Sequence, residues 1–173
     1  MEHIILLRGV TPNGKNAIPK MSYLVDILTE AGFQQVRTYI QSGNIILKSD
    51  LDLEEIREQV HTLIKEKIGA DLKMVIKNKN DLEEIVLENP FGEDYLYDRV
   101  HVIFYQGSIE SLPLEKLKID YGEEEICIGN YCLYLYLPRT AKHKKLHTNY
   151  LEKLFNVDLT MRKLNVVKKL LSK

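Results

Sequence analysis

The sequence predicts an α+β protein with two subdomains, the first of them ferredoxin-like. Within the first 78 residues, four short apolar runs and two amphipathic stretches follow one another in the order β-α-β-β-α-β. A second series of strand and helix patterns fills the rest of the chain. The 173 residues are 45% hydrophobic, which is enough for one sizeable core or two small ones. We therefore expect a ferredoxin-like subdomain at residues 1–78 and a related α+β unit with C-terminal helices at residues 79–173.

The elements of the first half follow from apolar periodicity and turn residues. A strand is expected at His3–Arg8, and a loop containing glycine and proline follows it. The first helix has apolar residues at i, i+3, i+4 and i+7 and ends at Gly32. Two strands then flank a turn at residues 41–43, and a second helix ends at Gly69. The supporting residues are Met21, Leu24, Val25 and Leu28 in the first helix, 36–40 and 44–48 in the two strands, Ile56, Val60, Leu63, Ile64 and Ile68 in the second helix, and 72–76 in a fourth strand.

The second half contains similar parts in a shifted order. A short helix ends before Pro90, and a loop rich in tyrosine and aspartate leads into a strand at Val100–Gln106. Residues 112–117 are expected to be helical, and a hairpin is expected to turn at Gly129 and Asn130. Two helices close the predicted chain, one near Asn149–Phe155 and one from about Met161 to Leu171.

The predicted hairpin determines where both cysteines lie. A two-residue turn places Cys127 directly opposite Cys132, on the sheet face that also carries Tyr134 and Tyr136. This face is polar and aromatic, so we expect it to meet solvent, a ligand or the other half of the molecule. Opposed cysteines lie within disulfide reach. We expect both to be reduced, because the composition indicates a reducing compartment.

Composition excludes several classes of protein. The chain has too much apolar content for a disordered protein and too few cysteines for a disulfide-stapled domain. No apolar run approaches the roughly 18–20 residues of a membrane span. The first residues lack the basic and small-residue pattern of a signal peptide. We therefore expect a cytoplasmic protein without a membrane partner.

Charge is divided unevenly along a nearly neutral chain. Residues 79–125 carry four basic and 13 acidic side chains, whereas residues 126–173 carry ten basic and two acidic ones. Such segments either neutralise each other on one surface or meet different partners. Both interpretations stay open at this point.

The loop after the first strand resembles a phosphate-binding loop only in part. Gly9, Gly14 and Lys15 match the pattern G-x-x-x-x-G-K, but Asn16 stands where such a loop needs a serine or threonine. Pro19 also delays the next helix, so its amides cannot point at a phosphate. We therefore do not expect a nucleoside triphosphatase of this type. Arg8 and Lys15 remain suited to contact an anion.

Residues 139–147 form the most basic stretch of the chain, with four cations and two histidines. This stretch is either a solvated loop or a contact for phosphate or nucleic acid. His143 and His147 have the i, i+4 spacing of a zinc pair, but no acidic residue lies between them and no third ligand is nearby. We expect neither a metal site nor a cofactor.

The predicted final helix carries cations in its first turn. Thr160 is a natural N-cap, which places Arg162 and Lys163 at the positive end of the helix dipole. This arrangement is unfavourable unless an anion binds there. The alternative is that Arg162 contacts the acidic segment of residues 79–125.

Several motifs carry a resemblance to a known family. The segments Leu7–Val10, Gly14–Asn16, Arg37–Asn44, Asn89–Phe91 and Thr160–Arg162 are similar to the bacterial domain of unknown function DUF1697, over essentially the whole chain. The resemblance implies two α+β subdomains of ferredoxin-like character and no established activity. The chain departs from the family pattern at Thr11 and Asn13. It also departs at Lys163, Leu164 and Val166, where the family pattern has asparagine, tryptophan and threonine.

Three classes of function follow from these observations. We favour a protein that binds a small anionic ligand bearing a phosphate or carboxylate, as a binding module or an enzyme. The candidate ligand-binding residues are Arg8, Lys15, Thr38, Tyr39, Ser42, Asn44, Lys145 and Arg162. The alternatives are a nucleic-acid-binding protein that uses the basic C-terminal segment, and a homodimer or protein-interaction module that uses an open sheet face. The RNA-binding signature R-G-F-G-F-V-x-F is missing, and the first and third strands lack aromatic residues.

Overall fold

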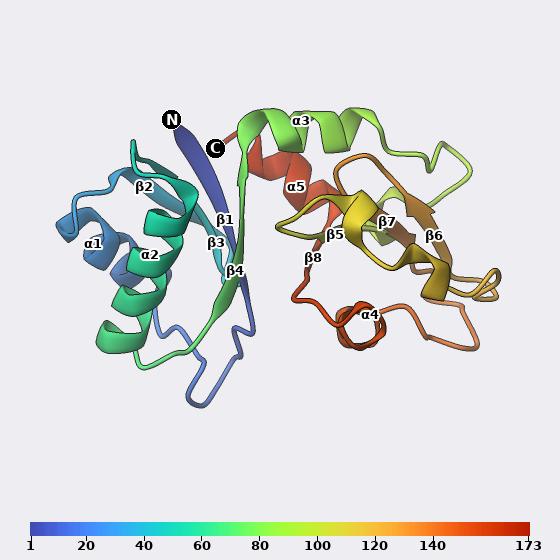
Figure 1. Cartoon of the computed structure of the whole chain (residues 1–173), viewed down its shortest axis with the longest axis horizontal. Helices are drawn as coiled ribbons and strands as arrows, with labels where there is room; N and C mark the ends of the chain where they lie inside the picture. Colours follow the sequence, from blue (N-terminus) through green and yellow to red (C-terminus); the bar gives the residue numbers. More distant parts are fainter. The chain divides into compact units, whose positions relative to one another are not determined.

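The computed structural model describes all 173 residues as two compact units, Met1–Lys79 and Asn80–Lys173. Each unit contains one four-stranded antiparallel sheet, and the chain has five α-helices in all (Figure 1). The predicted α+β class is therefore confirmed. The longest helix has 15 residues, and none of the helices has both the length and the apolar surface needed to cross a membrane.

The first unit follows the order β-α-β-β-α-β. Its sheet has the strand order β2-β3-β1-β4, and every neighbouring pair is antiparallel. The elements are β1 (Glu2–Arg8), α1 (Met21–Glu30), β2 (Gln34–Tyr39), β3 (Asn44–Lys48), α2 (Leu53–Lys67) and β4 (Lys73–Asn78).

Both helices of the first unit cover the same face of its sheet, as Figure 1 shows. The core lies between them, where residues of β1, β3 and β4 meet apolar stripes of α1 and α2. A capping box fixes the start of α2. The Asp52 carboxylate accepts a hydrogen bond from the backbone amide of Glu55 at 2.8 Å. The main core residues are Ile5, Leu7, Leu24, Leu28, Ile45, Leu47, Ile56, Val60, Ile64, Met74 and Ile76.

The second unit has the same strand order and directions as the first. Its sheet runs β6-β7-β5-β8, with every neighbouring pair antiparallel. Short 3₁₀ turns at Ile109–Ser111 and Leu114–Lys116 occupy the chain position that α1 holds in the first unit. The helix expected at residues 112–117 is therefore not formed. The elements are α3 (Lys79–Leu87), β5 (Val100–Phe104), β6 (Glu125–Ile128), β7 (Leu133–Tyr136), α4 (Thr148–Phe155), β8 (Thr160–Lys163) and α5 (Leu164–Leu170).

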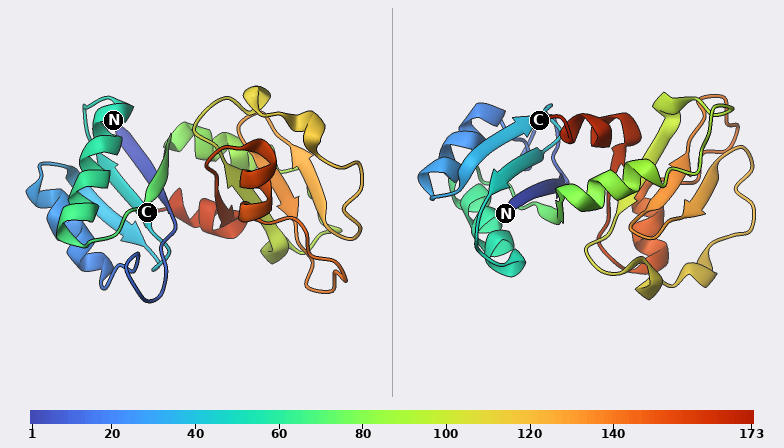
Figure 2. Two further views of the ribbon diagram at one scale, coloured as in Figure 1. Left: turned by 60° about the horizontal axis from the view of Figure 1, so that its bottom comes forward. Right: turned by 90° about the horizontal axis from the view of Figure 1, so that it is seen from above.

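Both faces of the second sheet are covered. On one face, Leu151 and Phe155 of α4 pack on Ile103 and Leu133. On the other face, the Tyr134 hydroxyl donates to a backbone carbonyl of α3 at 2.6 Å, and α5 packs along β5 and β8. Figure 2 shows these helices from two further directions. Tyr134 was expected to face solvent, a ligand or the other half, but α3 of its own unit buries it.

The hairpin register differs from the prediction. The turn contains four residues instead of two, and the Gly129 amide donates to the Cys132 carbonyl at 2.9 Å. Cys127 therefore lies opposite Tyr134, and Cys132 is buried within the turn. A two-residue turn at Gly129 and Asn130 favours positive φ at both residues, and neither has a positive φ here. A Cβ at Gly129 would lie 2.6 Å from the Tyr134 ring, so this position requires glycine. Both cysteines are free.

The predicted start of the final helix is also wrong. Thr160–Lys163 is an edge strand, β8, in which Arg162 pairs with Val102 of β5, and α5 begins only at Leu164. Pairing with β5 satisfies backbone groups that a helix would have satisfied locally. Arg162 is thus not in the first turn of a helix, and the argument from the helix dipole does not apply to it.

Candidate anion-binding site

Two cations lie side by side at one end of the first sheet. Arg8 is the last residue of β1 and pairs directly with Lys73, the first residue of β4. Residues paired in this way have Cα atoms about 4.5–5.5 Å apart and side chains on the same face. Arg8 is half-buried and Lys73 is exposed. The strand pairing therefore concentrates positive charge on the sheet face that α1 and α2 do not cover.

A hydroxyl lies on the other side of Arg8. The β1–β3 register pairs Leu6 with Asn44, and the Leu7 amide donates to the Gly43 carbonyl at 2.9 Å. Residues 40–43 form a turn, and the hydrogen bond between Leu7 and Gly43 places Ser42 at the same end of the sheet as Arg8. Ser42, Arg8 and Lys73 thus form a row across the end of the sheet, which we call the end row. Guanidinium, ammonium and hydroxyl groups are the common side-chain partners of phosphate and carboxylate oxygens.

The turn at residues 40–43 holds Ser42 in place. The buried Asn44 amide donates to the Tyr39 carbonyl and to the Ser42 hydroxyl, both at 3.0 Å. Gly43 has a φ of +84°, and a Cβ there would lie 2.8 Å from the Leu7 Cβ, so no other residue fits. The Gln41 amide donates to the Ile18 carbonyl at 2.8 Å. The motif S-G-N therefore has a structural purpose, which is to position Ser42.

The loop after β1 is anchored to the segment that leads into β4. The Asn16 side chain accepts the Asp71 amide at 3.1 Å, and no helix begins there. A hydrogen bond from His61 at 2.7 Å and the charge of Lys65 lower the pKa of the Asp71 carboxyl, and Lys15 contributes a smaller effect. Lys15 is thus exposed and near a carboxylate that several cations share.

The remaining predicted residues occupy different positions. The register places Tyr39 on the same face as Arg8, whereas Thr38 pairs with Ile45 and lies on the face covered by the helices. In the second unit, the Lys145 ammonium lies 4.7 Å from the centre of the Tyr150 ring. Burial and a hydrogen bond with Tyr121 raise the pKa of Tyr150 to about 12.

Arg162 lies on β8 of the second unit and is almost fully buried. Its Nη1 donates to the Thr160 hydroxyl at 2.8 Å and to the Met161 carbonyl at 2.9 Å. Thr160 and Arg162 are two residues apart on a strand, so both side chains lie on the same face. The threonine of this motif therefore orients the guanidinium.

The acidic segment holds the basic loop mainly through its backbone. Buried Glu124 accepts the amides of Lys145 and Leu146 at 2.6 and 2.9 Å, and exposed Glu123 accepts the amide of Lys142 at 3.2 Å. Arg139 also forms an exposed ion pair with an aspartate of this segment at 3.5 Å. These contacts favour the interpretation in which the two charged segments neutralise each other.

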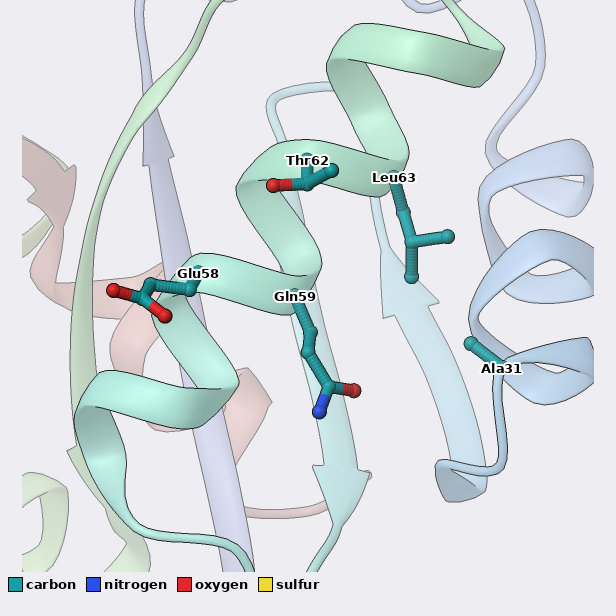
Figure 3. Close-up of a pocket in the computed structure, with 5 residues that line it drawn as sticks. All are labelled: Ala31, Glu58, Gln59, Thr62 and Leu63. Atoms are coloured by element: carbon teal, nitrogen blue, oxygen red, sulfur yellow. The ribbon is translucent and has the colours of Figure 1, made fainter.

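A shallow hollow of about 380 Å³ lies in the helical layer of the first unit (Figure 3). The end of α1 and one side of α2 line it, with Leu63 and Ala31 facing each other across it in the close-up. None of the predicted site residues contributes to it; its lining residues are Ala31, Glu58, Gln59, Thr62 and Leu63. No group of three or more histidine, cysteine, aspartate or glutamate side chains is arranged to hold a metal ion.

Sequence reasoning missed Lys73. Its position at the start of an expected strand is ordinary for a surface lysine, and only the pairing of β1 with β4 brings it beside Arg8. The available signal was the predicted ferredoxin-like order, in which the first and last strands are neighbours.

Comparison with known protein families gives one match for this chain. The family model described as "Protein of unknown function (DUF1697)" matches residues 1–134. The chain belongs to the DUF1697 family. The match includes all of the end row and extends to β7, while α4, β8 and α5 follow it. No curated protein matches this DUF1697 chain.

A solved structure has a similar fold over nearly the full length. It is "The structure of conserved bacterial protein SP0830 from Streptococcus pneumoniae", and the similarity has a TM-score of 0.73 at 20% sequence identity. The alignment covers 99% of this chain and 98% of that one. At this identity the similarity shows a shared fold and nothing about a ligand.

Proposed function

We propose that this DUF1697 protein binds a small molecule through its phosphate or carboxylate group, at the end row of Ser42, Arg8 and Lys73. The observation that carries the proposal is the direct pairing of Arg8 with Lys73. The pairing brings two positively charged side chains together at one end of the sheet, where an anion would be attracted to both.

The three side chains supply complementary interactions. Arginine offers a planar fork that matches two oxygens of a phosphate or carboxylate, whereas lysine contributes a mobile point charge. The half-burial of Arg8 reduces the screening of its charge by salt. Among the other predicted residues, Asn44 positions Ser42, and Tyr39 flanks the row on the same face. We assign Thr38, Lys15, Lys145 and Arg162 no direct contact with the ligand.

The same proposal includes the finer description of the fold. We propose that the first unit is ferredoxin-like, which its element order and the strand order β2-β3-β1-β4 support. The compact units Met1–Lys79 and Asn80–Lys173 support subdomain limits of 1–78 and 79–173. Two free cysteines are compatible with the cytoplasmic location that we propose.

Nucleic-acid binding is the less favoured function. On the face that carries Arg8, the central strands present Ile4, Leu6 and Ile46, which are buried aliphatic residues. Recognition of single-stranded RNA on such a sheet requires accessible aromatic residues. Glutamate side chains also hold the basic loop of the second unit, which offsets part of its charge.

Isothermal titration calorimetry with ligands found in a thermal-shift screen of phosphates and carboxylates tests the proposal. Arg8→Gln and Lys73→Gln are each expected to weaken binding about tenfold or more, because a hydrogen bond to a charged group contributes about 1.5–3 kcal/mol. Lys67→Gln, which removes an exposed charge elsewhere in the first unit, should leave affinity unchanged. The proposal fails if no compound in the screen binds, or if the control variant weakens binding as much as Arg8→Gln.

A further inference from the structure

Ile40 adopts a backbone conformation that its side chain disfavours. Its φ is 54°, in the left-handed region, where a β-branched residue is a genuine outlier. The other two non-glycine residues with positive φ are Gln35 and Asn156. Asparagine is a usual occupant of this region and ends α4 at Asn156. Isoleucine, in contrast, is not a usual occupant of the left-handed region.

Folding alone does not account for isoleucine at this position. The residue is 47% exposed, so only about half of its side chain gains from burial. Glycine or asparagine would form the same turn with less strain. The turn is held on both sides, by the Gln41 hydrogen bond to Ile18 and by the Asn44 hydrogen bond to the Tyr39 carbonyl. The surrounding contacts therefore maintain a strained, exposed apolar residue.

The position of Ile40 links it to the end row. Ile40 precedes Ser42 by two residues, so their Cα atoms lie within about 7 Å of each other. A ligand whose anionic group contacts Ser42 and Arg8 would therefore extend past Ile40 if it carried a further group on that side. Residues held in strained conformations cluster at ligand-binding sites, where they present a side chain in a fixed direction.

We infer that Ile40 is a specificity-determining contact, and that the ligand is an organic anion with an apolar or aromatic group next to its phosphate or carboxylate. This inference rests on the proposed function of the end row. It narrows the ligand class, because an inorganic anion or a fully polar phosphate would gain nothing from Ile40. A residue whose side chain is poorly suited to its backbone conformation lowers stability, and such residues are expected at functional sites.

The test compares inorganic phosphate with phenyl phosphate as probes, both measured by calorimetry. The natural protein should bind phenyl phosphate roughly tenfold more tightly than phosphate, which corresponds to burial of part of one apolar side chain. Ile40→Asn should reduce this ratio to about one without changing the affinity for phosphate. The same variant should have a higher unfolding midpoint, because asparagine tolerates the left-handed conformation.

Two further variants separate strain from contact. Gln35→Asn relieves strain at an exposed left-handed position of β2, so it should raise the unfolding midpoint and leave the ratio unchanged. Ile40→Ala shortens the side chain and removes its β-branching but keeps a Cβ in the left-handed region, so it should lower the ratio with a smaller gain in stability than Ile40→Asn. A ratio near one in the natural protein, or a ratio that Ile40→Asn leaves intact, overturns this inference while the end row stands. Absence of binding by both probes overturns the proposed function itself.

Discussion

Arg8 and Lys73 lie directly opposite each other on β1 and β4, at the end of the first sheet and on the face opposite α1 and α2. Neighbouring strands usually place opposite charges or uncharged residues at such positions. The pair gathers two positive charges at one point of the sheet, to which an anion would be attracted. Ser42 extends the row on the other side of Arg8, and the tight turn at Gly43 holds it there.

Gly43→Ala should be among the most destabilising single substitutions in the first unit. The new Cβ would lie 2.8 Å from the Leu7 Cβ, at a φ of +84°. We expect a loss of about 2–4 kcal/mol in the free energy of unfolding, from overpacking and from the left-handed conformation together. Urea denaturation measures it.

Gly32→Ala is the matched control for this prediction. Gly32 has a φ of +101°, but no atom lies within 4 Å of its added Cβ. Only the conformational cost of about 1–2 kcal/mol should remain. Equal losses in the two variants would show that contact with Leu7 contributes nothing.

Glu124→Ala should destabilise the second unit by about 2–4 kcal/mol, because it leaves the buried amides of Lys145 and Leu146 without their acceptor. Glu123→Ala removes one exposed hydrogen bond and should cost less than about 1 kcal/mol. Thermal unfolding of both variants decides the matter. A similar small loss in each would contradict the assigned role of Glu124.

His101 should make stability depend on pH. Burial lowers the pKa of His101, and the nearby positive charges of Arg99 and Lys163 lower it further, although a hydrogen bond to the Arg99 carbonyl partly opposes the shift. The unfolded state therefore takes up a proton before the folded state does. Stability from this group is complete above the unfolded pKa of about 6.5 and is lost as the pH falls through that value towards the folded pKa.

The variant His101→Asn should flatten this dependence between pH 7.5 and 5, which denaturation at a series of pH values measures. His143→Asn, which removes an exposed histidine, should retain the slope of the natural protein. If His101→Asn retains it as well, other groups cause the acid sensitivity.

The cysteines should titrate as two free thiols in denatured, unreduced protein. Cys127 lies opposite Tyr134 and not opposite Cys132, so the register does not place the two thiols side by side. Burial raises the pKa of the Cys127 thiol, which keeps it in its less reactive protonated form at neutral pH. A count of zero thiols would contradict this assignment.

The first unit was largely predictable because each of its elements has a clear local signal. The helix of residues 53–67 combines apolar periodicity with the capping pair Asp52 and Glu55, and glycines end both helices near their predicted positions. Patterns of period two and period 3.6 each determine which face is buried, so the α+β class followed from the sequence.

Tertiary pairing determined what the sequence did not show. The segment Thr160–Lys163 has too few residues for a periodic signal, and its strand conformation depends on hydrogen bonds to β5, a partner far along the chain. The predicted two-residue turn was wrong, because the pairing of β6 with β7 leaves four residues, 129–132, between the strands. Of the proposed site, Arg8 was predicted as the end of the first strand and Ser42 as a turn residue, whereas Lys73 is added only by the pairing of β1 with β4.

The location of anion binding is the central claim, and amide chemical shifts report it directly. A titration of isotopically labelled full-length protein with phosphate, at constant ionic strength, should shift the backbone amide signals of residues around Ser42, Gly9 and Lys73 with a single saturating curve. Arg8→Gln should abolish these shifts without altering the rest of the spectrum. Saturable shifts confined to residues 142–147 of the second unit, or no saturable shifts at all, would contradict the account.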